Sequence, residues 1–197
     1  MRKLIYFVAS TLDGFIAGTD GADPSTSIFD PSGAHAGPLM AEYPEMIPGH
    51  VRSVLGVEGV PNKHFDTILE GRGSYEIGTA AGIGDAYPHL RHLVFSTTLD
   101  STSDPAVELV GSAAVDRVRA LKDEQGLDIW LCGGGCMAAS LRDEIDEIHL
   151  KLYPVVLGDG IPLFGRVPGG ESEIDRFTLN GARVFDSGVA LMTYARA

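Results

Sequence analysis

The stretch Asp128–Arg142, DIWLCGGGCMAASLR, decides the fold. Its apolar run Ile129–Cys132 leads into three consecutive glycines, Gly133–Gly135, and then into residues that favour a helix. The pattern predicts a buried strand, a glycine turn and a helix. Because glycine has no Cβ atom, a phosphate group can lie against the backbone N–H groups of such a turn. Glycines at this place also serve simply to reverse the chain tightly, and both interpretations stay open here.

The spacing of these glycines excludes two well-known phosphate-binding motifs. The segment GGGCMA does not follow the pattern G-x-G-x-x-G, and no Gly-Lys-Ser or Gly-Lys-Thr sequence comes after it. The turn therefore carries neither the Rossmann fingerprint nor the P-loop. What remains is a nucleotide site of a third kind, or no site.

Length and composition predict a folded protein with a single domain, residues 1–197. Hydrophobic residues make up 44% of the chain and charged residues 21%, as in folded globular proteins. The longest apolar runs are too short to span a bilayer. The N-terminal segment Met1–Gly14 has only a brief apolar run, which predicts a first strand and not a signal peptide. The sequence thus predicts a cytoplasmic protein with no membrane partner.

The formal net charge of -12 limits the possible ligands and partners. A strongly acidic protein repels phosphate backbones and anionic membrane surfaces at long range, which argues against nucleic acid as a partner. A bound anion must therefore be held by local groups. The only cysteines, Cys132 and Cys136, have no second pair or histidine cluster near them in the sequence, so we predict buried packing residues and no metal site.

The segments along the chain alternate between strand and helix patterns. A long excursion, Thr19–Asn62, rich in Gly, Pro, Asp and Ser, separates the first strand from the second and predicts one or two short helices, at Pro38–Met46 and His50–Gly56. We call this segment the excursion. It walls a binding site or is a surface insertion. The best helix pattern is Ser112–Gln125, with Ser112 as its N-cap. The predicted strands are Lys3–Ser10, Phe65–Leu69, His92–Ser96, Val107–Val110, Ile129–Cys132, Ile145–Tyr153, Phe177–Phe185 and Val189–Ala195.

This order predicts an α/β fold with a mainly parallel central sheet, helices on both faces and a C-terminal antiparallel hairpin. The hairpin turn is Asp186–Gly188, where glycine can adopt a positive φ. In such a sheet, ligands bind at the carboxyl ends of the strands. Four polar or glycine-rich turns follow predicted strands and so fall on that edge, which favours a nucleotide-type site: Thr11–Gly18, Glu70–Ser74, Ser96–Thr98 and Gly133–Cys136.

Most of the chain resembles the dihydrofolate reductase superfamily, and more closely its bacterial branch related to the reductase domain of riboflavin biosynthesis. Each segment that carries the resemblance is modest alone, but their order and spacing together are specific. These segments are Ala9–Ala17, Gly71–Ser74, Phe95–Thr98, Leu131–Gly135 and Pro154–Gly160.

The resemblance implies a dihydrofolate reductase-like fold and an NADPH site. Arg72 resembles the arginine that pairs with the adenosine 2′-phosphate, and backbone groups of Ala9 and Ile16 resemble those that hold the nicotinamide. Asp159 lies in a loop that the family places near the active-site loop. The remaining implied cofactor residues are Gly71, Gly73, Ser74, Ser96, Thr97, Gly133, Gly134, Gly135, Cys136 and Met137.

The implied activity is hydride transfer from NADPH to a C=N or C=O group of a small heterocyclic or carbonyl substrate, pterin- or pyrimidine-like. The alternative is a nucleotide-binding or regulatory module of the same fold without turnover. Related reductases are often homodimers, so a homodimer is expected as well.

The departures from the family concern the substrate. No acidic residue aligns with the carboxylate that holds the pterin in dihydrofolate reductases; Glu42 and Glu45 are candidates by proximity alone. Riboflavin reductases usually have a basic residue where this chain has Phe15. Lys151 and Tyr153 share a face of a predicted strand and either reach the pocket or are ordinary sheet residues. The resemblance assigns no catalytic residue.

Overall fold

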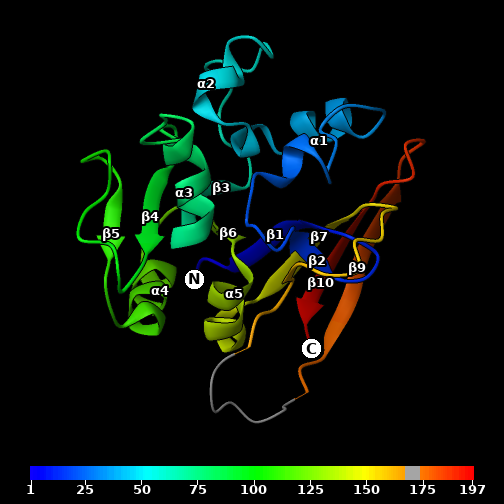
Figure 1. Ribbon diagram of the computed structural model, residues 1–197. Helices are drawn as coiled ribbons and strands as arrows, with labels where there is room; N and C mark the ends of the chain where they lie inside the picture. Colours follow the sequence, from blue (N-terminus) through cyan, green and yellow to red (C-terminus); the bar gives the residue numbers. More distant parts are fainter. Residues whose placement is uncertain (167–173) are drawn as a thin grey trace.

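The computed structural model describes residues 1–166 and 174–197. Its main element is an eight-stranded sheet in the order β5-β4-β3-β6-β1-β7-β10-β9, which crosses the middle of the molecule (Figure 1). Two further strands, β2 and β8, pair with each other outside this sheet. The strands are β1 Leu4–Ser10, β2 Phe15–Ala17, β3 Phe65–Gly71, β4 Arg91–Phe95, β5 Glu108–Val110, β6 Asp128–Gly133, β7 Glu147–Leu152, β8 Ile161–Pro162, β9 Phe177–Val184 and β10 Ala190–Arg196.

The sheet is mainly parallel, as the sequence predicts. Strands β1 and β3 to β7 run parallel to one another, whereas β10 pairs antiparallel with both β7 and β9. The turn of this terminal hairpin contains Gly188 with a φ of 83°, the left-handed conformation that glycine adopts most readily. The predicted fold class is confirmed.

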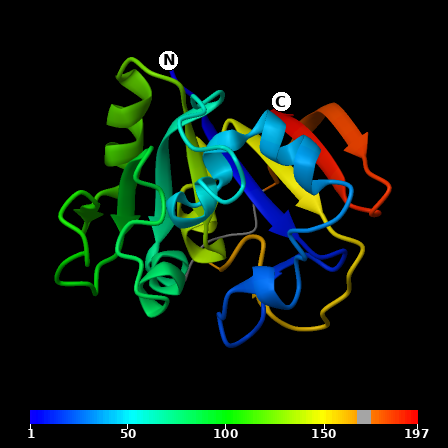
Figure 2. The ribbon, with the colours of Figure 1, turned by 90° about the horizontal axis from the view of Figure 1, so that it is seen from above.

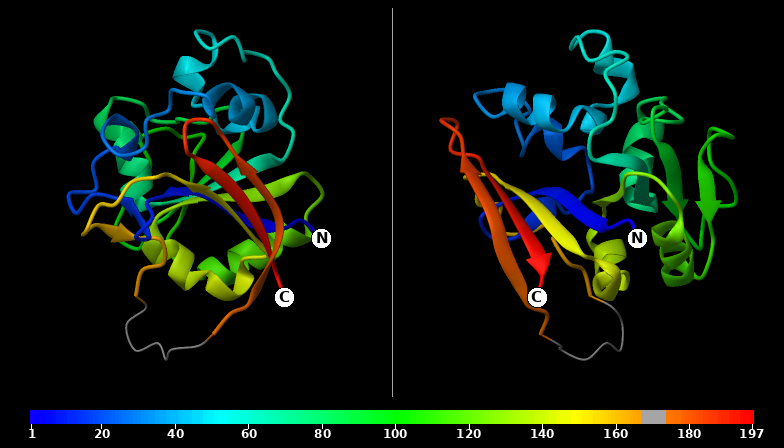
Figure 3. Two further views of the ribbon diagram at one scale, coloured as in Figure 1. Left: turned by 90° about the vertical axis from the view of Figure 1, so that its right-hand side faces the viewer. Right: turned by 180° about the vertical axis from the view of Figure 1, so that it is seen from behind.

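Helices cover both faces of the sheet (Figure 3). On one face lie α4, Ala114–Asp123, and α5, Gly135–Ser140; on the other lie α1, Ala36–Glu42, and α2, Gly49–Arg52. A further helix, α3, Arg72–Ala80, packs Tyr75 against strands β4 and β5.

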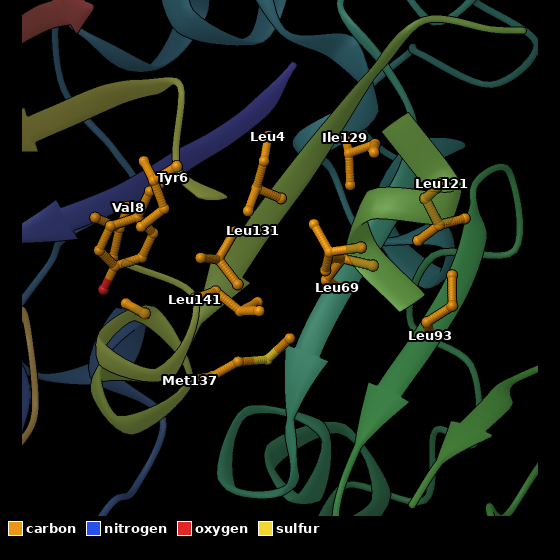
Figure 4. Packing of buried hydrophobic residues seen from close by; sticks show 13 residues of the cluster. Leu4, Tyr6, Val8, Leu69, Leu93, Leu121, Ile129, Leu131, Met137 and Leu141 are labelled. Atoms are coloured by element: carbon orange, nitrogen blue, oxygen red, sulfur yellow. The ribbon is translucent and has the colours of Figure 1, made fainter. Parts of the chain in front are cut away.

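The two faces of β1 explain its continuous apolar sequence. Leu4 and Tyr6 belong to the core beneath α4 and α5, together with Leu141, and Figure 4 shows them converging with the side chains of β6 and α5. The alternate residues Ile5 and Phe7 belong to a second core beneath the excursion. Because both faces are covered, the strand has no polar face.

The excursion forms short elements that lie over one face of the sheet (Figure 2). The predicted helical patch Pro38–Met46 is two elements, α1 and a 3₁₀ turn at Pro44–Met46, because Pro44 cannot continue the helix that ends at Glu42. The predicted patch His50–Gly56 is shorter than expected, since only α2 is helical there.

The predicted N-cap of the long helix is wrong. Helix α4 begins at Ala114, and the cap position is occupied by Ala113 with a φ of 53°. Ser112 therefore lies one residue too early in the chain to serve as the cap, and no side chain caps this helix.

Candidate functional site

The pairing of β1 with β6 ends before either strand does. The last backbone pair joins Tyr6 to Leu131, although β6 runs on to Gly133 and β1 continues beside β7. The next residue of β1 is Phe7, and its carbonyl accepts a hydrogen bond from the indole nitrogen of Trp130 over 2.9 Å. Central strands that separate at their carboxyl ends are where parallel sheets bind ligands.

Two of the predicted turns meet beside this point. A Cβ atom added to Gly71 would lie 3.5 Å from the backbone nitrogen of Gly134 and 3.6 Å from the Cβ atom of Met137. A Cβ atom added to Gly133 would lie 3.1 Å from the hydroxyl oxygen of Ser74. The turn after β3 and the triple glycine after β6 are therefore side by side.

The third turn is joined to them through Arg72. Its Nη1 donates to the hydroxyl of Thr98 over 3.0 Å, and its Nε lies 3.3 Å from a carboxylate oxygen of Glu76. About half of the guanidinium side chain is exposed, at 51%. The hydroxyl of Ser96 accepts two backbone N–H groups of its own turn, and Thr97 is exposed. We call the turns Gly71–Ser74, Ser96–Thr98 and Gly133–Gly135 the rim.

Internal packing accounts for Gly135 but not for Gly73. A Cβ atom at Gly135 would lie 2.1 Å from the carbonyl oxygen of Pro162, so the chain itself requires glycine there. A Cβ atom at Gly73 would meet nothing within 4 Å, and a glycine in a helix costs stability relative to alanine. Neither α3 nor α5 has a side-chain N-cap. The space at Gly73 and the uncapped amides of α3 fit a phosphate group of a cofactor.

The loop after β1 is anchored to the loop that contains Asp159. The Asp13 carboxylate accepts the N–H groups of Leu157 and Gly158. A hydrogen bond from the Thr11 hydroxyl, followed by these backbone bonds, lowers the pKa of Asp13 to about 2. Asp159 itself is exposed, and its carboxylate accepts the N–H group of Gly160 over 2.9 Å. The two loops thus lie together, as the resemblance implies.

The side chains of the two candidate nicotinamide residues pack in different cores. Ala9 packs with the core beneath the excursion, and Ile16, in β2, packs with the core beneath α5. Strand β2 pairs with β8, and the carbonyl of Gly14 accepts the N–H group of Leu163. The loop is therefore fixed at its far end by backbone hydrogen bonds.

The two cysteines differ from each other. Cys132 is partly buried and packs in the core beneath the excursion; burial, with the nearby charge of Glu70, raises the pKa of its thiol. Cys136 is exposed, so the prediction that both cysteines are buried is wrong for Cys136. In the first turn of α5 it is Met137 that enters the core.

The two candidate acids of the excursion bind their own chain. Glu45 has no exposed surface, and its carboxylate accepts the backbone N–H groups of Lys63, His64 and Phe65 over 3.2, 2.7 and 3.0 Å. Glu42 pairs with the imidazole of His64 over 3.2 Å. Glu45 thereby fastens the excursion to the start of β3, and its carboxylate is occupied by backbone.

The two remaining candidates are Lys151, in β7, and Tyr153, which directly follows that strand. Tyr153 places its hydroxyl 3.1 Å from Nε2 of His35, a residue of the excursion. Lys151 pairs in register with Ala9 of β1, and its Nζ lies 4.7 Å from the centre of the Phe7 ring. Lys151 is thus a direct neighbour of the candidate nicotinamide residue.

A buried cluster of three polar side chains, from Glu70, Asp85 and His92, was not predicted from the sequence. Nε2 of His92 lies 2.8 Å from Glu70, and Nδ1 lies 2.8 Å from Asp85. Burial disfavours the charged ring, but the hydrogen bonds and charges of both carboxylates outweigh it and raise the pKa of His92. The three residues come from separate segments. The only sequence signal was a pair of polar residues, Glu70 and His92, inside apolar strands.

The fold is that of the dihydrofolate reductase-like proteins. Residues 2–191 match the family described as the RibD C-terminal domain, and the chain belongs to that family. Family and fold together support a reductase.

Known proteins resemble the chain over nearly its full length. It is 28% identical over 198 residues to the uncharacterized protein YwjB of Bacillus subtilis, covering 100% of this chain and 99% of that protein. A putative riboflavin biosynthesis protein from Shewanella sp. PV-4 is 21% identical with a TM-score of 0.69, covering 100% and 99%. Enterococcus faecalis dihydrofolate reductase, solved with NADP(H), is 16% identical with a TM-score of 0.60, covering 98% and 96%. Within residues 1–166 and 174–197, no helix has the length and apolarity needed to cross a membrane.

Proposed function

We propose that the protein is an NADPH-dependent reductase that transfers a hydride to a small heterocyclic or carbonyl substrate. The observation that carries the proposal is the meeting of Arg72, the uncapped start of α3 and the triple glycine where the pairing of β1 and β6 ends. Membership of the RibD C-terminal domain family supports it.

The rim would hold the phosphates. Arg72 offers the adenosine 2′-phosphate a planar fork of donors, and the hydroxyl of Thr98 orients that fork. The amides of Gly73 and Ser74, at the positive end of the α3 dipole, would face the pyrophosphate. At a net charge of -12 the whole protein repels an anion, but screening weakens distant charges far more than a group in contact.

The other end of the site would orient the reaction. NADPH, when bound, supplies the hydride. Backbone groups of Ala9 and Ile16 would hold the reacting ring, and the anchored loop Asp13–Ala17 would exclude water from it. The carbon of the substrate C=N or C=O group gains the hydride, and its nitrogen or oxygen gains a proton, which water can supply.

Binding and turnover test the proposal separately. Purified protein is titrated with NADPH while the dihydronicotinamide fluorescence is followed, and NADPH consumption is then measured with pterins, pyrimidines and quinones. Stoichiometric binding with consumption is expected. Absence of binding would reject the proposal.

The second candidate is a nucleotide-binding module without turnover. It is favoured by one observation, namely that the two candidate acids, Glu42 and Glu45, are both engaged within the chain. Stoichiometric NADPH binding with no consumption by any compound of the panel is the result that this candidate requires.

A further inference from the structure

Lys151 differs from the other cations of low exposure in this protein. Arg2 pairs with Asp66, Lys122 pairs with Asp146 over 2.6 Å, and Arg52 donates to three backbone carbonyls. Lys151 is only partly exposed. Across residues 1–166 and 174–197, its ammonium group forms no hydrogen bond or ion pair, and it lies over the Phe7 ring, which is 1% exposed.

Among residues 1–166 and 174–197 no carboxylate pairs with this ammonium, and Glu70, the acid beside Cys132, is paired with His92. Phe7 is apolar, and burial raises the pKa of the Cys132 thiol, which keeps the sulfur neutral. On the excursion side, burial lowers the pKa of His35, and the charge of Lys151 contributes to that shift. Burial also lowers the pKa of Lys151. A half-buried cation without an anion is costly to a folded protein, and no carboxylate of the described residues pairs with this one.

The position of Lys151 indicates which kind of ligand would supply the negative charge. Its Cα pairs with that of Ala9 across β1 and β7, so the ammonium lies beside the proposed seat of the reacting ring, on the face covered by the excursion. One ammonium among uncharged groups balances one negative charge. A phosphate dianion would need further donors, whereas a carboxylate attached to an aromatic ring fits both the single charge and the apolar surroundings.

We propose that Lys151 binds a carboxylate of the substrate, so that the site takes heteroaromatic monocarboxylates in preference to their neutral counterparts. The inference rests on the proposed function for the placement of the reacting ring. It goes beyond that function by naming the substrate class and the residue that selects it.

Matched pairs of probes test the inference. Pterin-6-carboxylate is compared with pterin, and uracil-6-carboxylate with uracil, by calorimetric titration with and without saturating NADP⁺. The acid of at least one pair is expected to bind about 10- to 100-fold more tightly than its neutral match, the range for a charge-assisted hydrogen bond. Lys151→Met should remove this preference, and Lys151→Arg should retain most of it.

A matched control keeps the result specific. Lys3→Met removes an exposed lysine that pairs with Glu147 at the other end of β7, and it should leave the acid preference intact. If Lys151→Met does not fold, Lys151→Gln replaces it. Equal binding of acid and neutral probes to the unmodified protein, or a preference that persists without the ammonium, would overturn the inference.

The outcomes separate this inference from the proposed function. An acid preference in a protein that binds no NADP⁺ would reject the proposed function and keep Lys151 as a carboxylate site. Tight NADP⁺ binding without an acid preference would reject the Lys151 inference alone.

Discussion

The excursion contains polar groups that are buried and hydrogen-bonded within the chain, whereas those of the rim are more exposed. In the excursion, the fully buried carboxylate of Glu45 accepts three backbone N–H groups, and the buried guanidinium of Arg52 donates to three backbone carbonyls. In the rim, Arg72 is half exposed and α3 begins without a side-chain cap. Polar groups that hold the fold are satisfied within the chain, whereas the rim combines a half-exposed guanidinium, held by Thr98 and Glu76, with uncapped helix amides that a ligand can reach.

This contrast implies that substitutions in the excursion damage stability and those in the rim damage binding. The largest effect is expected from Glu45→Ala, which leaves buried N–H groups at the start of β3 without an acceptor. We expect a loss of about 3 kcal/mol in the free energy of unfolding, measured with urea. The NADPH affinity of the folded protein should not change.

Glu42→Ala is the control for that substitution. Its carboxylate is 52% exposed, so its loss should change the free energy of unfolding by less than about 1 kcal/mol. The contrast fails if Glu45→Ala leaves stability unchanged and weakens NADPH binding instead.

Gly73→Ala should move stability and binding in opposite directions. A Cβ atom there has no neighbour within 4 Å in the chain, so alanine should stabilise α3 by roughly 0.5–1 kcal/mol. The same methyl group would occupy the approach to the α3 amides, and we expect roughly tenfold weaker NADPH binding, a loss of about 1.4 kcal/mol. Thermal unfolding and calorimetric titration measure the two effects.

Thr79→Ala, near the end of the same helix, is the matched control for Gly73→Ala. It should raise helix stability slightly and leave NADPH affinity unchanged. A Gly73→Ala variant that binds NADPH as tightly as the unmodified protein would show that the space at this glycine is not used.

The smallest effect is expected from protonation of Asp13 at low pH, because its carboxylate anchors the loop after β1. The pKa of Asp13 is about 2 in the folded protein against an ordinary value of 3.8. Its contribution to stability is therefore present above the ordinary value and is lost as the pH falls through the folded one. The amide resonance of Gly158, which donates to Asp13, should titrate with a midpoint of about 2. Asp13→Asn should abolish that titration, and a midpoint at the ordinary value would contradict the anchored loop.

The fold was predictable because its signals are local. The continuous apolar sequence of β1 reflects two covered faces, and Gly188 provides the positive φ that the hairpin turn needs. The rim was predictable for a similar reason, since glycines at strand ends and a following arginine are adjacent in the sequence.

The substrate side was less predictable because its contacts join distant segments. Glu45 and Phe65, or His92 and Asp85, come together only through tertiary packing. Cys136 looked like a buried residue, and only the orientation of α5 decides that Met137 enters the core in its place. The role of a polar side chain therefore depended on partners that no local pattern contains.

The central claim is that Arg72 and bare amides at the rim hold a phosphorylated dinucleotide, and the discrimination between NADPH and NADH tests it most directly. Both are titrated calorimetrically into the unmodified protein, into Arg72→Ala, and into Arg91→Ala, which removes an arginine of similar exposure at the opposite end of β4. The account predicts NADPH binding about 10- to 100-fold tighter than NADH, lost in Arg72→Ala and kept in Arg91→Ala. Equal affinities in the unmodified protein, or a preference for NADPH that survives Arg72→Ala, would contradict it.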